Sequence, residues 1–435
     1  MRSVRMGISS FLSAFAFVAF VWHFWHSTHA GSKSVPSVIS ASAAPGTRTH
    51  QNYAYDKQIR NETLGFQKVF VISLPERGDR LDAFALSSSL TGFKADVAHG
   101  VNGSTVPDAA IPSTDGLHKV NTYGMKDPHA RDAVVGTWRA HLNIARTIVQ
   151  ERLSSALIIE DDSDWDVTLK DRLVDFGNGA RHFSKHATGE KPKNPYGDNW
   201  DMLWLGHCAI TECPAVDPHS STDPNNPHPP EPTQLTQQRF LIENDATTPP
   251  PAHRFNFATI PDLSPYADTT RAVFRADFGI CLYSYALSYS GAQKVLRQQA
   301  VRTKWAPIDL GMGEMCKDQA QPFNCIGVFP QLVDSHKMAG AYARDSNIDQ
   351  NPKDDVREMA YTFNLKYSTR LNVDRLLRGE APITQWPDDP EIVAAPGGTK
   401  YRVEDVQAGQ TANVMPQGAV FANGEGQKTD GQPTQ

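Results

Sequence analysis

The sequence predicts an α/β domain with a mostly parallel sheet flanked by helices. Three short apolar segments, 68–74, 156–159 and 202–205, have the length and composition of buried strands. A helical repeat of apolar residues over 138–153 separates the first two of them. Alternation of strands with helices favours parallel pairing. Hydrophobic residues make up 40% of the 435 residues and charged residues 21%, so most of the chain can form a core.

The net charge argues against one class of partner. The chain has 42 Lys and Arg against 48 Asp and Glu, a formal charge of −6. Because binding to phosphate backbones requires a concentrated basic surface, we expect no nucleic-acid partner.

The N-terminus predicts a membrane address. Arg2 and Arg5 precede an apolar run over 7–25 that is long enough to cross a bilayer. Basic residues on the N-terminal side place that end in the cytoplasm, so we expect a cytoplasmic tail (1–6), a signal-anchor and a lumenal domain. This is the layout of a single-pass type II membrane protein of the Golgi or endoplasmic reticulum. The alternative is a cleaved secretory signal that ends near Ala30.

Composition divides the rest of the chain. Residues 26–64 are expected to form a flexible stem, and 65–405 the globular domain. A Pro-rich insertion over 214–251 interrupts that domain, and 406–435 is expected to be a disordered tail.

The lumenal address allows disulfides among the five cysteines. Two local pairs suggest themselves, Cys208 with Cys213 and Cys316 with Cys325, but the sequence does not determine the connectivity.

The elements follow in order along the domain. The strand at 68–74 leads through a turn to a helix that Asp79 caps, and a second strand is expected at 94–98. The next helix carries its apolar residues at steps of three and four, namely Trp138, Leu142, Ala145, Val149 and Leu153. Later strands are expected at 202–205 and 326–329.

An acidic cluster ends the strand at 156–159. Glu160, Asp161, Asp162 and Asp164 place four carboxylates within five residues. In open α/β sheets, ligands bind at the carboxyl ends of the strands, and Mg²⁺ or Mn²⁺ takes one or two carboxylates plus substrate phosphates. The cluster therefore predicts a metal site, and the alternative is an acidic turn that caps a helix and faces water.

These features together resemble glycosyltransferase family 25, the family of bacterial lipopolysaccharide galactosyltransferases and collagen-modifying galactosyltransferases. Segment 156–162, an apolar strand that ends in Glu-Asp-Asp, is the most specific match. Segments 69–80 and 136–141 are similar to the family's opening strand with its Arg-x-x-Arg turn and to its Gly and Ser-His helix. Ala140 stands where the family usually has the serine. Weaker matches lie at 285–292 and 307–309.

The resemblance implies a GT-A fold and an inverting transfer of a sugar, normally galactose, from a nucleotide-sugar donor such as UDP-galactose to a glycan or glycoprotein hydroxyl. Among the acidic residues, Asp162 is the first choice for a ligand of Mn²⁺ or Mg²⁺, with Glu160 and Asp164 next. Asp161 is assigned to the ribose or sugar of the donor. For Asp164 the alternative is a cap of the following segment.

Five further residues complete the predicted site. Arg77 and Arg80 are expected to bind the donor phosphates or uracil, with solvated surface arginines as the alternative. Asp309 is assigned as the acceptor-side base or, alternatively, a helix cap, and His141 as a catalytic or a helix-packing residue. His336 is expected to complete the metal shell.

Two rival functions use the same features. A glycoside hydrolase requires two carboxylates about 5–10 Å apart and no nucleotide. A non-catalytic lumenal glycan-binding protein would keep the fold without turnover.

Overall fold

The computed structural model describes residues 50–112, 128–184, 190–213, 236–255, 260–301, 307–317, 322–341, 356–387, 389, 398–407 and 411–412. The predicted cytoplasmic tail, signal-anchor and most of the stem lie outside these residues, as do 214–235 of the insertion. Within the described part of the chain, no helix has both the length and the apolar character to cross a membrane.

A large sheet forms the centre of the domain. Its spatial order is β16 (Lys400–Gln407), β7 (Thr236–Glu243), β9 (Arg271–Ile280), β11 (Cys325–Phe329), β5 (Met202–Gly206), β10 (Ser284–Ser288), β3 (Ser155–Glu160), β1 (Lys68–Ser73) and β2 (Asp96–His99), and β6 (Ala209–Glu212) pairs with β9. The strands β1, β2, β3, β5, β7 and β11 run in one direction, and β9, β10 and β16 run in the other.

The prediction of a mostly parallel sheet is confirmed in part. Direct parallel pairing occurs for β1 with β2, β1 with β3, and β5 with β11. The half of the sheet that contains β6, β7 and β9 is antiparallel. The residues described between β5 and β10 form no α-helix. Successive strands in this part of the chain therefore have no helical crossover, which parallel neighbours usually require.

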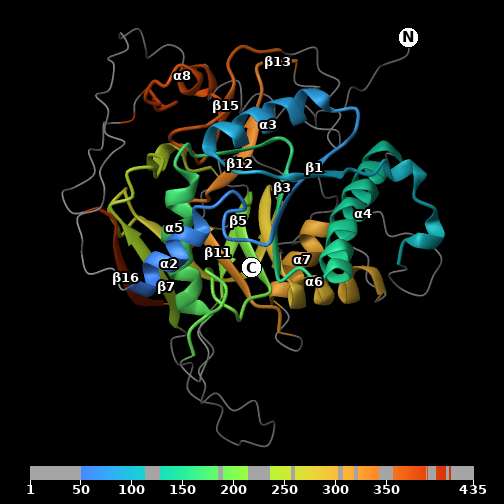
Figure 1. The fold of residues 1–435 in the computed structure, drawn as a ribbon, viewed down its shortest axis with the longest axis horizontal. Helices are drawn as coiled ribbons and strands as arrows, with labels where there is room; N and C mark the ends of the chain where they lie inside the picture. Colours follow the sequence, from blue (N-terminus) through green and yellow to red (C-terminus); the bar gives the residue numbers. More distant parts are fainter. Residues whose placement is uncertain are drawn as a thin grey trace, which may run out of the picture. The chain divides into compact units, whose positions relative to one another are not determined.

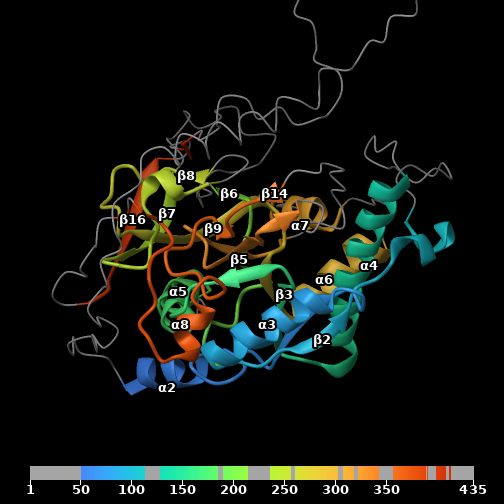
Figure 2. The ribbon, with the colours of Figure 1, turned by 90° about the horizontal axis from the view of Figure 1, so that it is seen from above.

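Helices cover both faces of the sheet. The helices are α2 (His50–Ile59), α3 (Gly78–Thr91), α4 (Pro128–Glu151), α5 (Leu169–Phe183), α6 (Tyr289–Leu296), α7 (Ile308–Lys317) and the short α8 (Val373–Leu377). Residues of α4, α6 and α7 share one buried core, and residues of α2, α3 and α5 share the other. Figures 1 and 2 show the central strands between these two groups.

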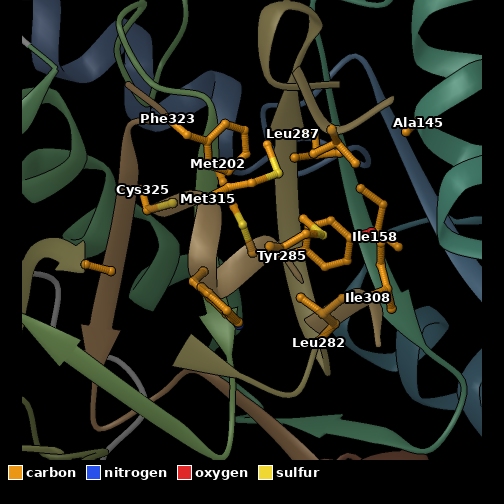
Figure 3. Close-up of a cluster of buried hydrophobic side chains, with 14 of the residues drawn as sticks. Ala145, Ile158, Met202, Leu282, Tyr285, Leu287, Ile308, Met315, Phe323 and Cys325 are labelled. Carbon is orange, nitrogen blue, oxygen red and sulfur yellow. The ribbon is translucent and has the colours of Figure 1, made fainter. Parts of the chain in front are cut away.

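Alternate residues of each central strand enter the two cores. On β3, for example, Ile158 belongs to the first core and Leu157 to the second. The predicted apolar stripe of α4 packs in the first core, which confirms that helix, and Figure 3 shows Ala145 of α4 near Ile158 and Tyr285. Burial on both faces explains why the central strands are apolar throughout.

Three boundaries differ from the sequence prediction. Helix α2 lies inside the predicted stem, and Ile59 at its end is fully buried, so residues 50–59 of that stem are folded. Strand β7 lies inside the predicted insertion, and β16 extends past residue 405, where the tail was expected to begin. These two strands pair with each other over their full length, from Thr236 with Gln407 to Glu243 with Lys400.

One of the two disulfides was predicted correctly. Cys316 pairs with Cys325, as expected. Cys208 pairs with Cys281, and not with Cys213. The bond joins the start of β6 to the turn between β9 and β10, two sites that are 73 residues apart in sequence and so invisible to an argument from local spacing.

A second, small sheet lies at the carboxyl end of β3. Its order is β15 (Tyr361–Thr362), β12 (Val333–Lys337) and β4 (Ser163–Trp165). Because β4 continues directly from the acidic residues, this sheet fixes their geometry.

Candidate functional site

The acidic turn, residues 160–164, lies at the carboxyl edge of the central sheet. The backbone N–H of Glu160 donates to the carbonyl of Tyr283 (3.0 Å), and that of Asp161 donates to the carbonyl of Ile72 at the end of β1 (3.1 Å). The turn is therefore held between β1 and the start of β10, which is the edge where ligands bind in α/β sheets.

Arg80 neutralises part of this turn. Its Nη1 lies 2.9 Å from Oδ1 of Asp161 and 3.4 Å from Oδ2 of Asp162, and the side chain is buried. Burial, together with the charge of Asp162, raises the pKa of Asp161 in spite of Arg80. The structure thus brings Arg80 to the predicted site. Arg77 instead forms two hydrogen bonds of 2.9 Å with Asp79 and lowers the pKa of Asp79 to about 2.

The buried side chain of His141 lies beside Glu160. The imidazole is 2% exposed, with Nδ1 2.8 Å from the hydroxyl of Tyr285 and Nε2 3.4 Å from Oε1 of Glu160. Burial raises the pKa of Tyr285, so its hydroxyl stays protonated and can donate to Nδ1, while Nε2 faces Glu160. His141 is therefore placed to position Glu160 and does not reach the surface.

Asp164 has a structural environment. Its carboxylate is fully buried, and Oδ1 accepts from the backbone N–H of Trp165 (2.8 Å) and of Arg370 (3.1 Å). Oδ2 accepts from the hydroxyls of Thr362 (2.7 Å) and Ser368. Because both oxygens already accept two hydrogen bonds, the structure gives Asp164 a structural role in place of the predicted metal-ligand role.

Asp162 and His336 are neighbours across two strands. In the pairing of β12 with β4, Ser335 lies opposite Ser163, and the N–H of His336 donates to the carbonyl of Asp162 (2.7 Å), which continues the register by one residue. Directly opposite residues of an antiparallel pair project to the same side. The side chain of Asp162 is 21% exposed, and that of Asp161 is 9% exposed. Burial lowers the pKa of His336 to about 4, so the ring is neutral.

Asp309 approaches the same region from α7. It lies in the first turn of that helix, and its Oδ2 accepts from the backbone N–H of Cys281 (3.1 Å). Burial raises the pKa of Tyr283, and several carboxylates, among them Asp162, Glu160 and Asp309, raise it further. The ring of Tyr283 therefore lies among the predicted metal ligands and the predicted base.

Residues 356–387 add groups that the sequence motifs did not indicate. Nε of Arg370 donates to the carbonyl of Ser163 (3.0 Å), and its Nη2 donates to the carbonyl of Asp161 (2.6 Å). Thr362 contacts both His336 and Asp164. These residues lie in a segment without apolar periodicity, so the sequence carries no signal for them.

These side chains offer few ligands to a metal. Across the described residues, no three His, Cys, Asp or Glu side chains are grouped so that they could hold a metal. A two-residue site is consistent with Mg²⁺ or Mn²⁺ chemistry, because these ions take part of their shell from substrate phosphates. Asp162 and His336 fit that requirement, with Glu160 next to them.

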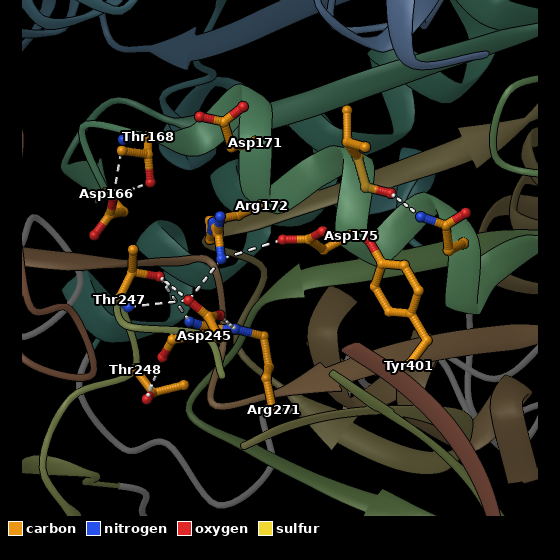
Figure 4. A network of polar contacts seen from close by, with 12 residues as sticks. Asp166, Thr168, Asp171, Arg172, Asp175, Asp245, Thr247, Thr248, Arg271 and Tyr401 are labelled. Carbon is orange, nitrogen blue, oxygen red and sulfur yellow. Dashed lines mark hydrogen bonds and ion pairs between the residues drawn. The ribbon is translucent and has the colours of Figure 1, made fainter. Parts of the chain in front are cut away.

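A second acidic cluster lies beside α5 and pairs with two arginines. Asp245 pairs with Arg172 (2.6 Å) and Arg271 (2.8 Å), and these charges lower its pKa (Figure 4). Asp175 also lies 3.1 Å from Arg172. Because arginines already occupy these carboxylates, we assign the cluster a structural role.

A small pocket lies beside β11. Its volume is about 60 Å³, and its lining includes Phe183, Arg275 and Phe323. None of the predicted site residues lines it, and it is too small for a nucleotide sugar.

Comparison with known proteins gives partial matches to one family. No protein-family model matches the chain. The chain is similar to procollagen galactosyltransferase 1 of Danio rerio, at 21% identity over 58% of this chain and 31% of that protein. It is also similar to inactive glycosyltransferase 25 family member 3 of Homo sapiens and to its probable inactive counterpart in Bos taurus, at 26% identity over 34% of this chain and 23% of theirs. The chain thus spans less than a third of the length of these curated relatives, which are all glycosyltransferases of family 25 or inactive members of it.

Proposed function

We propose that this protein is a glycosyltransferase that transfers galactose from UDP-galactose to a hydroxyl of a glycan or glycoprotein, with inversion and with help from Mn²⁺ or Mg²⁺. One observation carries the proposal: Asp162, the most accessible aspartate of the acidic turn, lies across from His336 at the carboxyl edge of β3. The similarity to a galactosyltransferase supports the choice of reaction and sugar.

The departing nucleotide determines what this edge has to supply. Cleavage of the sugar–phosphate bond leaves extra negative charge on the diphosphate, and groups that stabilise this charge lower the barrier. Asp162 and His336 would hold a divalent cation, and that cation supplies positive charge and Lewis-acid character when bound. Arg80 and Arg370 hold the turn in place, since one pairs with its carboxylates and the other with its carbonyls.

The acceptor hydroxyl must lose a proton as it attacks. Asp309 is assigned as the base that takes this proton. The N–H of Cys281 holds its carboxylate, and its charge acts on Tyr283 together with the charges of Glu160 and Asp162. Glu160, which His141 orients, borders the same space.

The proposed location is the lumen of the Golgi or endoplasmic reticulum, with the N-terminal apolar run as a single-pass type II anchor. The two disulfides support this location, since such bonds persist in oxidising compartments. The acceptor is proposed to be a glycan or glycoprotein of that compartment.

A non-catalytic glycan-binding protein is the second candidate. Relatives named as inactive members of family 25 favour it. Such a protein would keep the fold and the glycan contacts without releasing nucleotide.

The test is a donor screen. The purified protein is incubated with UDP- and GDP-sugars, with and without Mn²⁺, and with a procollagen chain as an acceptor suggested by the relative's name. We expect release of UDP from UDP-galactose only when Mn²⁺ or Mg²⁺ is present, and a product with the inverted anomeric configuration by NMR. Glycan binding without nucleotide release would support the second candidate, and cleavage of a glycan without any donor would indicate a hydrolase.

A further inference from the structure

Side chains from the strands on both sides of β12 meet at His336. Thr362 lies directly opposite His336 in the pairing of β15 with β12, and its Oγ1 lies 2.8 Å from Nδ1 of the imidazole. On the other side of β12, Asp162 and Asp164 project from β4 and its preceding turn. Nδ1 of His336 is 3.8 Å from Oδ2 of Asp164, which confirms that these side chains share one side of the small sheet.

The protons of this cluster can be assigned. Oδ2 of Asp164 lies 2.7 Å from Oγ1 of Thr362, and three other donors also point at this carboxylate: the N–H groups of Trp165 and Arg370 and the hydroxyl of Ser368. Asp164 therefore acts as an acceptor. The single hydroxyl proton of Thr362 is donated to Asp164, so the same oxygen can only accept from His336.

This assignment determines the tautomer of His336. Nδ1 carries a proton for its hydrogen bond to Thr362, so Nε2 is the ring nitrogen that can offer a lone pair. Over the residues that the structure describes, no hydrogen bond reaches Nε2, while the side chain is 9% exposed and otherwise buried. Nε2 is therefore a buried nitrogen that can bind a cation, on the side of the small sheet to which Asp162 also projects.

We propose that Thr362 and Asp164 are positioning residues that hold His336 as the Nδ1–H tautomer, so that Nε2 and Asp162 together bind a divalent cation of the Mn²⁺ or Mg²⁺ type. The inference rests on the proposed function and deepens its metal site. Ligand histidines are commonly oriented by such a partner on the second nitrogen, and loss of the partner typically weakens metal binding by about 10–100-fold. Here the partner is a hydroxyl that relays to a carboxylate.

The test measures metal binding and the tautomer separately. Full-length wild type, Thr362→Val and Thr362→Ser are titrated with Mn²⁺ in the presence of UDP, and free Mn²⁺ is followed by electron paramagnetic resonance. Valine keeps the shape of threonine without the hydroxyl, and serine keeps the hydroxyl. We expect wild-type affinity for Thr362→Ser and a loss of about 10–100-fold for Thr362→Val.

The tautomer is measured without metal. ¹⁵N-histidine-labelled wild type gives the protonation of each ring nitrogen by NMR, with His336→Asn to assign the signals. We expect a protonated Nδ1 in wild type and in Thr362→Ser. Because this measurement uses the wild type, it remains decisive if thermal unfolding shows that Thr362→Val does not fold.

Each contrary result overturns a different statement. A protonated Nε2 in metal-free wild type, or equal Mn²⁺ affinity of Thr362→Val and wild type, overturns the positioning role of Thr362. Absence of Mn²⁺ and Mg²⁺ binding by wild type overturns the cation site itself, and with it the metal step of the proposed function.

Discussion

Asp162 is the aspartate of the acidic turn whose oxygens the protein uses least. Asp164 accepts four hydrogen bonds and Asp161 pairs closely with Arg80, whereas Asp162 has a longer contact of 3.4 Å with Arg80 and keeps 21% of its side chain exposed. A buried carboxylate whose oxygens already accept hydrogen bonds cannot bind a cation, whereas a partly exposed carboxylate can. The roles of Asp161, Asp162 and Asp164 thus differ because other segments of the chain bring different partners to each of them.

Replacement of Asp162 by alanine tests this distinction. We expect Asp162→Ala to reduce the rate of UDP release by about 100-fold or more, because a preorganised charge at the departing diphosphate is lost. Its thermal unfolding should stay close to wild type, since the side chain is not a buried structural partner. Asp96→Ala, at an exposed carboxylate on β2, is the matched control and should keep the wild-type rate. A wild-type rate in Asp162→Ala would contradict the metal assignment.

Asp309 calls for a different substitution. Asparagine has the same shape, and its Oδ1 can still accept from the N–H of Cys281, so Asp309→Asn should fold normally. An amide cannot take the acceptor proton, so we expect kcat to fall by about 100-fold or more. The Kd for UDP, measured by calorimetry, should remain within twofold of wild type. Loss of UDP binding with kcat unchanged would assign Asp309 to the donor and not to the acceptor.

At the scale of elements, the sequence was sufficient where the signal is local. β1, α3, α4, β3, β5 and β11 were all predicted within a few residues, apart from the first ten residues of α4, because apolar spacing reports buried faces directly. The small sheet of β4, β12 and β15 could not be predicted, since strands of two to five residues show no usable periodicity. Its contacts join residues about 200 positions apart, such as Asp164 and Thr362.

The candidate site follows the same division. The acidic turn and Arg80 could be named as candidates because the turn directly follows β3 and Arg80 lies in α3, the helix after β1. Thr362 and Arg370 were missed because they act through hydrogen bonds to that turn and belong to no pattern of their own. The pairing of Cys208 with Cys281 was also missed, because it joins β6 to the turn after β9, which is 73 residues away. Cys281 has a φ of +62° in that turn.

The end of β5 supplies a pH-dependent contact between two elements. Nε2 of His207 donates to the carbonyl of Val328 on β11 (2.9 Å), and the ring is fully buried. Burial lowers the pKa of His207 to about 4, from an ordinary value of 6.5. A lowered histidine pKa means that the stabilisation is complete above pH 6.5 and is lost as the pH falls toward 4.

A urea-unfolding comparison checks this contact. The free energy of unfolding of wild type, relative to His207→Gln, should fall by roughly 3 kcal/mol between pH 7.5 and pH 4. The variant is less stable at neutral pH, but it lacks this titration, so only the difference between the two pH values matters. An equal pH dependence in both proteins would show that His207 does not titrate on unfolding.

At the scale of the whole molecule, the two disulfides secure the region that carries the proposed base. Cys208–Cys281 anchors the turn whose N–H holds Asp309, and Cys316–Cys325 ties the end of α7, the helix of Asp309, to the start of β11. Both bonds therefore act on the surroundings of Asp309, whereas hydrogen bonds and the ion pairs of Arg80 fix the acidic turn.

The two bonds should differ in what they contribute. A cross-link stabilises by restricting the unfolded chain, more so for longer loops, so a separation of 73 residues predicts about 4 kcal/mol and a separation of 9 about 2.5 kcal/mol. We expect this order when Cys208→Ser/Cys281→Ser and Cys316→Ser/Cys325→Ser are unfolded in urea without reductant. The Cys208→Ser/Cys281→Ser variant should also release UDP more slowly at temperatures where it remains folded, because the turn that holds Asp309 loses its anchor. Peptide mapping of the wild type by mass spectrometry provides the control for the pairing. A reversed order of stability would contradict the loop-length argument, and a Cys208–Cys213 peptide in the map would contradict the connectivity and with it the proposed support of Asp309.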